Sequence, residues 1–216
     1  MTQLVRPALT SRPLYEEVAE HLRQRIFSRQ LAPGAWVDES IITAELGISR
    51  TPLREAIKVL ATEGLMTMQP RRGAYVTDVS EQDLREVFEL LALLESDAAS
   101  VVAAQNNAQT LLALDALHTQ LLTAKDDHEA FFTLNEQFHA ELLKAAGNRW
   151  RQQTVADLRK VMKLNRHHSL FKTGRVEESI KEHSAIMAAL RCGDAPKTAL
   201  AMRHHMLQGL EAASLN

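Results

Sequence analysis

Three histidines and one asparagine in the second half of the chain have types and spacing that could bind a metal ion. Asn135 and His139 are four residues apart, so on a helix both side chains would point to the same side. His183 and His205 follow in two later segments. Three imidazoles and one amide oxygen that meet in a helical core would suit Zn²⁺ or Ni²⁺. A histidine on a helix is more commonly a surface or hydrogen-bonded residue, so the spacing alone leaves both interpretations open.

A second set of residues, nearer the N-terminus, could bind DNA. The helix predicted after Gly47 carries four polar side chains near its start, namely Ser49, Arg50, Thr51 and Arg54. Arginine can donate two parallel hydrogen bonds to guanine or to a phosphate, and hydroxyl groups suit phosphate oxygens. Arg50 and Arg54 would share one face of this helix, opposite a buried apolar stripe. This is the arrangement of a recognition helix whose N-terminus enters the major groove.

A short basic turn follows the predicted recognition helix. Two predicted strands, 65–69 and 74–77, enclose a turn that contains Arg71, Arg72 and Gly73. The arginines could reach DNA, and the glycine would let the backbone approach a groove closely, as in minor-groove contacts. Either basic pair alone also fits a solvated surface. A basic helix followed by a basic hairpin favours DNA binding.

The elements that must position these residues are indicated by helical periodicity and by turn residues. Residues 1–12 show no pattern and predict a loose arm. Residues 13–78 predict a winged helix-turn-helix: a helix over 14–28, a short helix from the N-cap Asp38 to residue 46, a helix capped by Ser49, and the hairpin.

Residues 79–216 predict an all-α bundle of six to seven helices. Apolar residues recur at helical spacing, and glycine or Asx residues interrupt them. The predicted helices are 81–105, 108–125, 127–146, 149–170, 175–192 and 195–214. The expected fold class is therefore mainly α, with an N-terminal winged helix-turn-helix and a C-terminal helical bundle.

Composition and charge limit the classes of protein that fit. Of the 216 residues, 45% are hydrophobic and 24% charged, which allows packed domains and excludes a disordered chain. The first 78 residues hold ten Lys/Arg and nine Asp/Glu, so DNA binding would depend on a few well-placed arginines. The single cysteine, Cys192, excludes an intramolecular disulfide. No apolar run is long enough to cross a membrane, and we expect a cytoplasmic protein.

Four stretches of the N-terminal segment form a specific pattern. They are Leu-Ala-Pro-Gly (31–34), Leu-Gly-Ile-Ser-Arg-Thr-Pro-Leu-Arg-Glu-Ala (46–56), Leu-Ala-Thr-Glu-Gly-Leu (60–65) and Pro-Arg-Arg-Gly-Ala-Tyr-Val (70–76). This pattern resembles the DNA-binding domain of the GntR family of bacterial transcription regulators. The resemblance implies that DNA is contacted by Ser49, Arg50, Thr51, Arg54 and Gly73. A basic residue that the family often uses in the preceding helix is replaced here by Ser40, so one family contact is expected to differ.

The second part carries a further set of matching residues. They include Leu94-Glu95, Asn135 with Phe138-His139, Ala146-Gly147-Asn148, Glu182-His183, Gly193-Asp194-Ala195 and Met202-Arg203-His204-His205. This set resembles the FCD domain, the helical effector domain of FadR-type GntR regulators. The resemblance implies a divalent metal ion, Zn²⁺ or Ni²⁺, held by Asn135, His139, His183 and His205. Aspartate is the commoner first ligand in that subgroup, so Asn135 predicts a lower affinity or a different metal.

The resemblance also bears on the effector. An arginine that often faces the family's pocket is replaced here by Leu91. A carboxylate effector would then bind at the open positions of the metal, or Arg159 or Arg166 would substitute, or the effector would be less acidic. Both arginines are equally compatible with a solvated surface, which we rank first.

These observations lead to one preferred function and two alternatives. We expect a homodimeric, ligand-responsive repressor that binds double-stranded operator DNA and a small organic-acid effector. A direct metal sensor is the first alternative. The second is a metal-dependent, hydrolase-like enzyme, since a bound metal could activate water. Against an enzyme, Glu136 and Glu141, the carboxylates nearest His139 in sequence, would point away from it, which leaves no expected general base.

Overall fold

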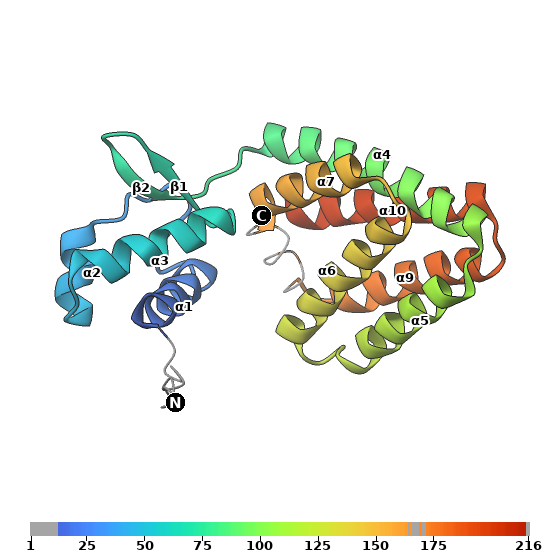
Figure 1. Cartoon of the computed structure of the whole chain (residues 1–216), viewed down its shortest axis with the longest axis horizontal. Coiled ribbons are helices and arrows are strands. Elements are labelled where there is room, and N and C mark those ends of the chain that lie inside the picture. Colours follow the sequence, from blue (N-terminus) through green and yellow to red (C-terminus); the bar gives the residue numbers. More distant parts are fainter. Residues whose placement is uncertain (1–12, 164, 166–168, 170–171, 215–216) are drawn as a thin grey trace, which may run out of the picture. The chain divides into compact units, whose positions relative to one another are not determined.

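The computed structural model describes residues 13–163, 165, 169 and 172–214, and these belong to two compact units that divide between Asp78 and Val79 (Figure 1). The predicted arm 1–12 and Arg166 lie outside the described residues. Each unit is described by itself.

The N-terminal unit consists of three helices and a two-stranded wing. The helices are α1 (Leu14–Phe27), α2 (Glu39–Leu46) and α3 (Arg50–Thr62). Asp38 caps α2 by accepting hydrogen bonds from the backbone of Ser40 and Ile41, and Gly47 ends it in the left-handed conformation, as predicted. The buried stripes of α1 and α3 pack together and form the core of the unit, and they consist of Val18, Ala19, Leu22, Ile26, Leu53, Ala56, Ile57 and Leu60.

The wing is an antiparallel hairpin of β1 (Met66–Gln69) and β2 (Gly73–Val76). Its register pairs Met66 with Val76 and Gln69 with Gly73, so the turn at its tip contains residues 70–72. Val76 and Ala74 point inward and are buried, whereas the tip is exposed. The hairpin predicted from sequence is therefore confirmed, with its second strand displaced by one residue.

The C-terminal unit is a helical bundle. Within the described residues its helices are α4 (Glu81–Gln105), α5 (Ala108–Thr123), α6 (His128–Ala145), α7 (Arg149–Val161), α9 (Arg175–Arg191) and α10 (Ala195–Ser214). A capping box of Ser80 and Asp83 starts α4. Asn107, Asp127 and Asn148 each accept backbone hydrogen bonds at the start of the following helix. The Asx residues predicted as helix breaks are thus N-caps.

One predicted helix differs from the structure. The sequence predicts a helix over 149–170, but α7 ends at Val161 with Met162 as its C-cap. No glycine or proline stands between 161 and 170, so no local signal marks this break, and the described residues Lys163, Asn165 and Ser169 are again helical.

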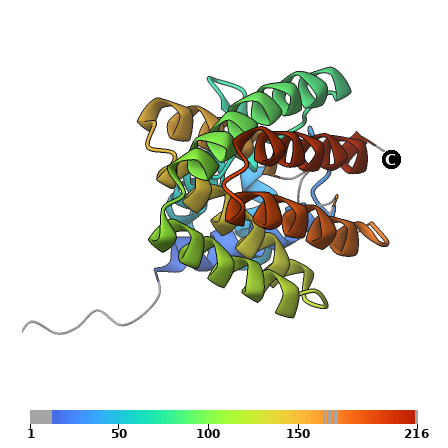
Figure 2. The same ribbon diagram turned by 90° about the vertical axis from the view of Figure 1, so that its right-hand side faces the viewer.

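The helices of the bundle are neighbours in a defined order. α4 packs along α10, α10 against α9, α9 against α5, and α5 against α6, as Figures 1 and 2 show. α6 also contacts α4 and α7, and Phe88, Phe131 and Phe138 are the largest side chains of the core. The mainly α fold class, with a winged helix-turn-helix followed by a helical bundle, is confirmed. Among the described residues, none of the helices has both the length and the apolarity that crossing a membrane requires.

Candidate functional site

The first turn of α3 presents the polar residues predicted to touch DNA. Ser49, Arg50, Thr51 and Arg54 are all exposed, on the side away from the buried stripe. Ser49 occupies the N-cap position, but its hydroxyl makes no capping hydrogen bond to the described helix. Pro52, three residues after the cap, removes one of the two backbone N–H groups that usually donate to such a hydroxyl. The hydroxyl and the positive end of α3 therefore remain available to an anion.

Arg54 is held by a surface ion pair. Its Nε donates to both carboxylate oxygens of Glu39, at 3.2 and 3.0 Å, while its side chain is 58% exposed. An exposed pair of this kind contributes about 1 kcal/mol or less. A phosphate could therefore replace Glu39 at little cost.

A groove of about 630 Å³ joins α3 to the wing. Thr51, Arg54 and Lys58 line it from α3, and Arg71 and Gly73 line it from the wing. Glu39 and Glu55, the ion-pair partners of Arg54 and Lys58, also belong to its wall. Ser49, Arg50 and Arg72 are exposed but are not part of this lining. The structure thus brings the recognition helix and part of the basic turn to one surface.

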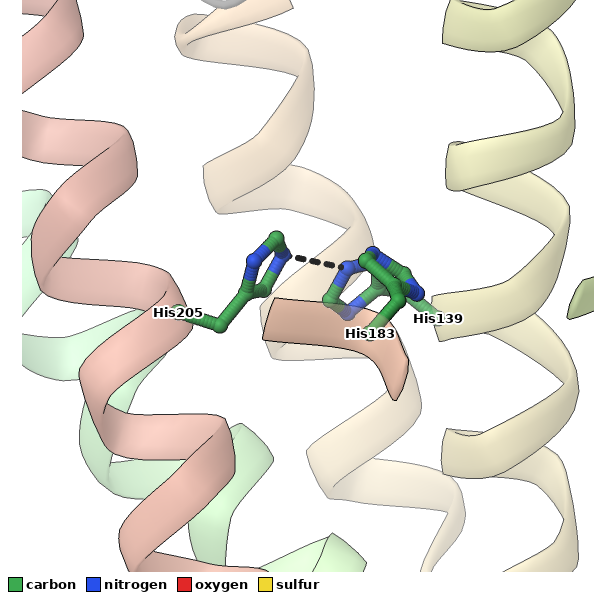
Figure 3. A group of neighbouring side chains, drawn as sticks. All are labelled: His139, His183 and His205. Atoms are coloured by element: carbon green, nitrogen blue, oxygen red, sulfur yellow. Dashed lines mark hydrogen bonds between the residues drawn. The ribbon is translucent and has the colours of Figure 1, made fainter. Parts of the chain in front are cut away.

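Three helices bring His139, His183 and His205 together in the bundle core (Figure 3). They come from α6, α9 and α10, all three are buried, and one ring nitrogen of each lies within 4.8 Å of the others. The Nε2 atoms of His139 and His205 are 3.1 Å apart. Asn135 joins the cluster, because its Oδ1 lies 2.8 Å from Nε2 of His183. The four residues predicted as ligands from sequence are therefore neighbours.

Two carboxylates, which sequence reasoning missed, hold the outer nitrogens of two of these rings. Oε2 of Glu95 lies 2.6 Å from Nδ1 of His139, and Oε2 of Glu182 lies 2.6 Å from Nδ1 of His205. The sequence analysis considered only Glu136 and Glu141, the carboxylates nearest His139 along the chain, and assigned no such contact to Glu95 or Glu182. Both contacts connect different helices, so spacing along the chain could not reveal them. A carboxylate on Nδ1 fixes that nitrogen as the proton donor and directs the Nε2 lone pair toward the cluster.

Each carboxylate is in turn paired with a buried arginine. Arg159 donates to Glu95 through Nε at 2.8 Å, and it also reaches Glu136 at 3.0 Å. Arg175 makes a bidentate pair with Glu182, at 2.7 and 2.6 Å. The solvated surface ranked first for Arg159 was wrong, because its side chain is only 8% exposed. Arg159 is paired with Glu95 and Glu136, and its contact with an effector stays a prediction.

Burial and the neighbouring charges determine the protonation states of the cluster. Burial would raise the pKa of Glu95, but Arg159 and His139 outweigh it and hold this pKa below its usual range. Burial lowers the pKa of His139 to about 4, with a further contribution from Arg159. Burial also lowers the pKa of His183 and of His205. The three imidazoles are therefore neutral near pH 7, which is the form that binds metal ions.

A small cavity opens beside the histidine cluster. Its volume is about 40 Å³, and its lining includes Asn135, His205, Arg175 and Ser179 with the apolar side chains Phe88, Phe132 and Met206. Arg175, which the sequence analysis did not select, brings a positive charge to this wall. The signal that could have indicated it is its place seven residues, or about two helical turns, before Glu182.

Comparisons with known proteins match both units to known domains. Residues 14–76 match the family described as bacterial regulatory proteins, gntR family, and residues 86–208 match the FCD domain. The chain is 33% identical to an uncharacterised HTH-type transcriptional regulator of Streptomyces ambofaciens, over 86% of this chain and 78% of the relative. It is 26% identical to the HTH-type transcriptional repressor RspR of Escherichia coli, over 91% and 87%. The solved structure of Escherichia coli McbR/YncC has a similar fold, with a TM-score of 0.70 and 22% identity over 94% of this chain and 98% of that one.

Proposed function

Because the chain belongs to the GntR family of DNA-binding transcription regulators and carries an FCD effector domain, we propose that it is a repressor controlled by a metal ion and a small acidic effector. In this proposal the winged unit binds operator DNA, and the helical unit binds Zn²⁺ or Ni²⁺ together with the effector. A metal-binding effector unit would shift the protein between DNA-binding and non-binding states.

The proposed DNA contacts are Ser49, Arg50, Thr51 and Arg54 on α3, with Arg71, Arg72 and Gly73 on the wing. The uncapped start of α3 supports this assignment, since its first turn holds no acidic residue that would neutralise the positive end of the helix. The shared groove supports it further, because a duplex that contacts α3 would meet Arg71 at the same surface.

The single observation that carries the metal proposal is the pair of facing Nε2 atoms. His139 and His205 each have their Nδ1 proton directed at a carboxylate, so two Nε2 lone pairs face each other across 3.1 Å. This arrangement is unfavourable unless a cation lies between them, and the lowered pKa values of both rings disfavour a proton there. The buried Nδ1 of His183 also has no hydrogen-bond partner among the described residues. The residues present therefore fit a divalent metal with nitrogen ligands.

The neighbouring cavity supports an effector that reaches the same centre. The donor pairs are separated by 2.8 and 3.1 Å. Asn135, His139, His183 and His205 could together hold a divalent metal ion, which would supply a positive charge for an acidic ligand. An effector carboxylate in the cavity would also meet Arg175, which lines the cavity and is paired with Glu182.

A homodimer is supported by an apolar surface on α4 and α7. Leu90, Leu93 and Trp150 are 49%, 56% and 69% exposed, on two helices that contact each other. A second copy of the chain could cover this surface and place two winged units on a pseudo-palindromic operator.

The DNA proposal is tested by fluorescence anisotropy with DNA from the region upstream of the protein's own gene. We expect binding that weakens steeply as salt increases, because arginine–phosphate contacts release counterions. Binding that is absent at low salt, or equal for any sequence, would contradict a specific operator function.

The metal proposal is tested by elemental analysis of the purified protein and of His205→Ala, with His204→Ala as the matched control. His204 is exposed and adjacent to His205, so it shares the local sequence but not the cluster. We expect one metal ion per chain in the parent and the control, and a loss of the metal ion in His205→Ala.

The effector is identified in a second experiment, in which small mono- and dicarboxylic acids are screened for release of the metal-loaded protein from operator DNA. Release of the protein from operator DNA by the metal ion alone would indicate a direct metal sensor instead.

A further inference from the structure

An aromatic pair lies next to the basic turn of the wing. The backbone N–H of Val37 donates to the carbonyl of Ala74, and the N–H of Val76 donates to the carbonyl of Ala35, both at 2.9 Å. These two bonds make Trp36 and Tyr75 directly opposite residues of an antiparallel bridge. Because the bonds flank the pair and do not join it, this is a non-hydrogen-bonded pair, the type in which opposite side chains lie closest.

Trp36 and Tyr75 share the outer face of the hairpin with Gly73. Ala74 and Val76 point inward and are buried, so Gly73 and Tyr75, which alternate with them along β2, point to the other side. Trp36 is 56% exposed, although it is a large aromatic residue.

The indole of Trp36 occupies the space beside Gly73. A Cβ added to Gly73 would lie 2.9 Å from Nε1 of Trp36, closer than real side chains approach. Gly73 also has φ of +97°, which a side chain would strain. The glycine at the end of the turn is therefore required by Trp36 and by the backbone, before any contact with DNA is considered.

Tyr75 also reaches this turn. Its hydroxyl donates to the carbonyl of Arg72, at 3.4 Å. Arg71 has φ of +63°, a left-handed conformation that disfavours a residue with a side chain. A strained residue persists only where its surroundings hold it, and the aromatic pair contacts the two residues that follow Arg71, because Tyr75 bonds Arg72 and Trp36 lies beside Gly73.

We propose that Trp36 and Tyr75 form an aromatic brace that holds the Arg71–Arg72 turn in the conformation that meets DNA. Trp36 is thus a positioning residue for the wing, which acts through the arginines. This inference rests on the proposed function, because it assumes that Arg71 and Arg72 bind DNA.

The test is a double-mutant cycle on the full-length protein. Affinity for DNA from the region upstream of the protein's own gene is measured by fluorescence anisotropy. The variants are Trp36→Ala, the double change Arg71→Ala/Arg72→Ala, and all three changes combined. We expect Trp36→Ala to weaken binding by about tenfold, equal to the loss of about one well-placed arginine contact. In the variant without the wing arginines, the same change should weaken binding by less than about twofold, because the contact that it positions is already gone.

Two further variants keep the test informative if Trp36→Ala does not fold. Trp36→Phe retains an aromatic ring opposite Tyr75 and should keep most of the affinity, whereas Tyr75→Phe removes only the hydroxyl and should weaken binding by less than Trp36→Ala.

Equal losses from Trp36→Ala with and without the wing arginines would overturn the brace, because Trp36 would then act through folding or by touching DNA itself. If Arg71→Ala/Arg72→Ala binds as tightly as the parent, the proposed DNA role of the wing fails. If the arginine variant loses affinity and the Trp36 variants do not, only the brace fails.

Discussion

Acidification should destabilise the metal-free protein through its buried histidines. In the folded state burial lowers the pKa of His139 to about 4, whereas an exposed imidazole in the unfolded chain has a pKa of about 6.5. Between these two values the unfolded chain binds a proton that the folded protein does not. Stability from this group is therefore fully present above about pH 6.5 and is lost as the pH falls toward 4.

The size of the effect follows from the two pKa values. At pH 5 the linkage relation gives a loss of about 2 kcal/mol for His139 alone. His183 and His205 also have lowered pKa values, so they add to the loss in the same direction. For a chain of this length, about 2 kcal/mol corresponds to a fall in melting temperature of roughly 4 to 8 °C.

The assay is thermal and urea unfolding, followed by circular dichroism, of chelator-treated protein at pH 7.5 and pH 5. His139→Gln removes the titrating ring and should reduce the difference between the two pH values by about 2 kcal/mol. His204→Gln is the matched control and should leave the difference unchanged, because His204 is exposed. An undiminished pH dependence in His139→Gln, or a parent protein that becomes more stable at pH 5, would refute the reasoning.

Three other changes test separate parts of the structure. Glu95→Gln leaves the buried Arg159 with Glu136 as its remaining carboxylate, and it should lower the free energy of unfolding by about 3–5 kcal/mol in urea titrations. Glu136→Gln should cause a smaller loss, because Glu136 is partly exposed. Equal losses in the two variants would contradict the assignment of Glu95 as the main partner of Arg159. Arg54→Ala should weaken operator binding and lower the slope of log affinity against log salt concentration by about 0.9. The control Arg191→Ala, in the helical unit, should change neither quantity. An unchanged affinity in Arg54→Ala would exclude Arg54 from the DNA interface. Asn135→Asp adds a negative charge to the histidine cluster, and it should raise Zn²⁺ affinity by about tenfold or more in chelator competition, which corresponds to about 1.4 kcal/mol. A weaker Zn²⁺ affinity in this variant would show that Asn135 is not a ligand.

Local sequence signals predicted most of the fold. Asp38 and Gly47 mark the start and end of α2, and Asn107, Asp127 and Asn148 begin three helices, because side-chain caps and glycine act within a few residues of the chain. The end of α7 at Val161 lacked such a signal, and so periodicity could not locate it.

The candidate site was predictable only in part, because the sequence does not show how side chains on different helices are oriented toward one another. His139, His183 and His205 could be selected by type and spacing, together with a family resemblance. The contacts of Glu95 and Glu182 with these rings join residues 44 and 23 positions apart, and they depend on how helices pack. Arg159 illustrates the same limit, because its sequence fits a surface and the packing of α7 buries it. The role of Trp36 likewise depends on a bridge to Tyr75 that no local pattern indicates.

α4 has a mechanical consequence for regulation. Glu95, which holds His139, lies on the same uninterrupted helix as Glu81, the residue that follows the link to the winged unit. The two residues are fourteen positions apart, or about 21 Å along the helix, so a tilt of α4 by about 5° around Glu95 would displace its first turn by about 2 Å. If the proposed metal ion changes its ligands, a small tilt of α4 around Glu95 would therefore move the first turn of this helix much more than the core around the histidines.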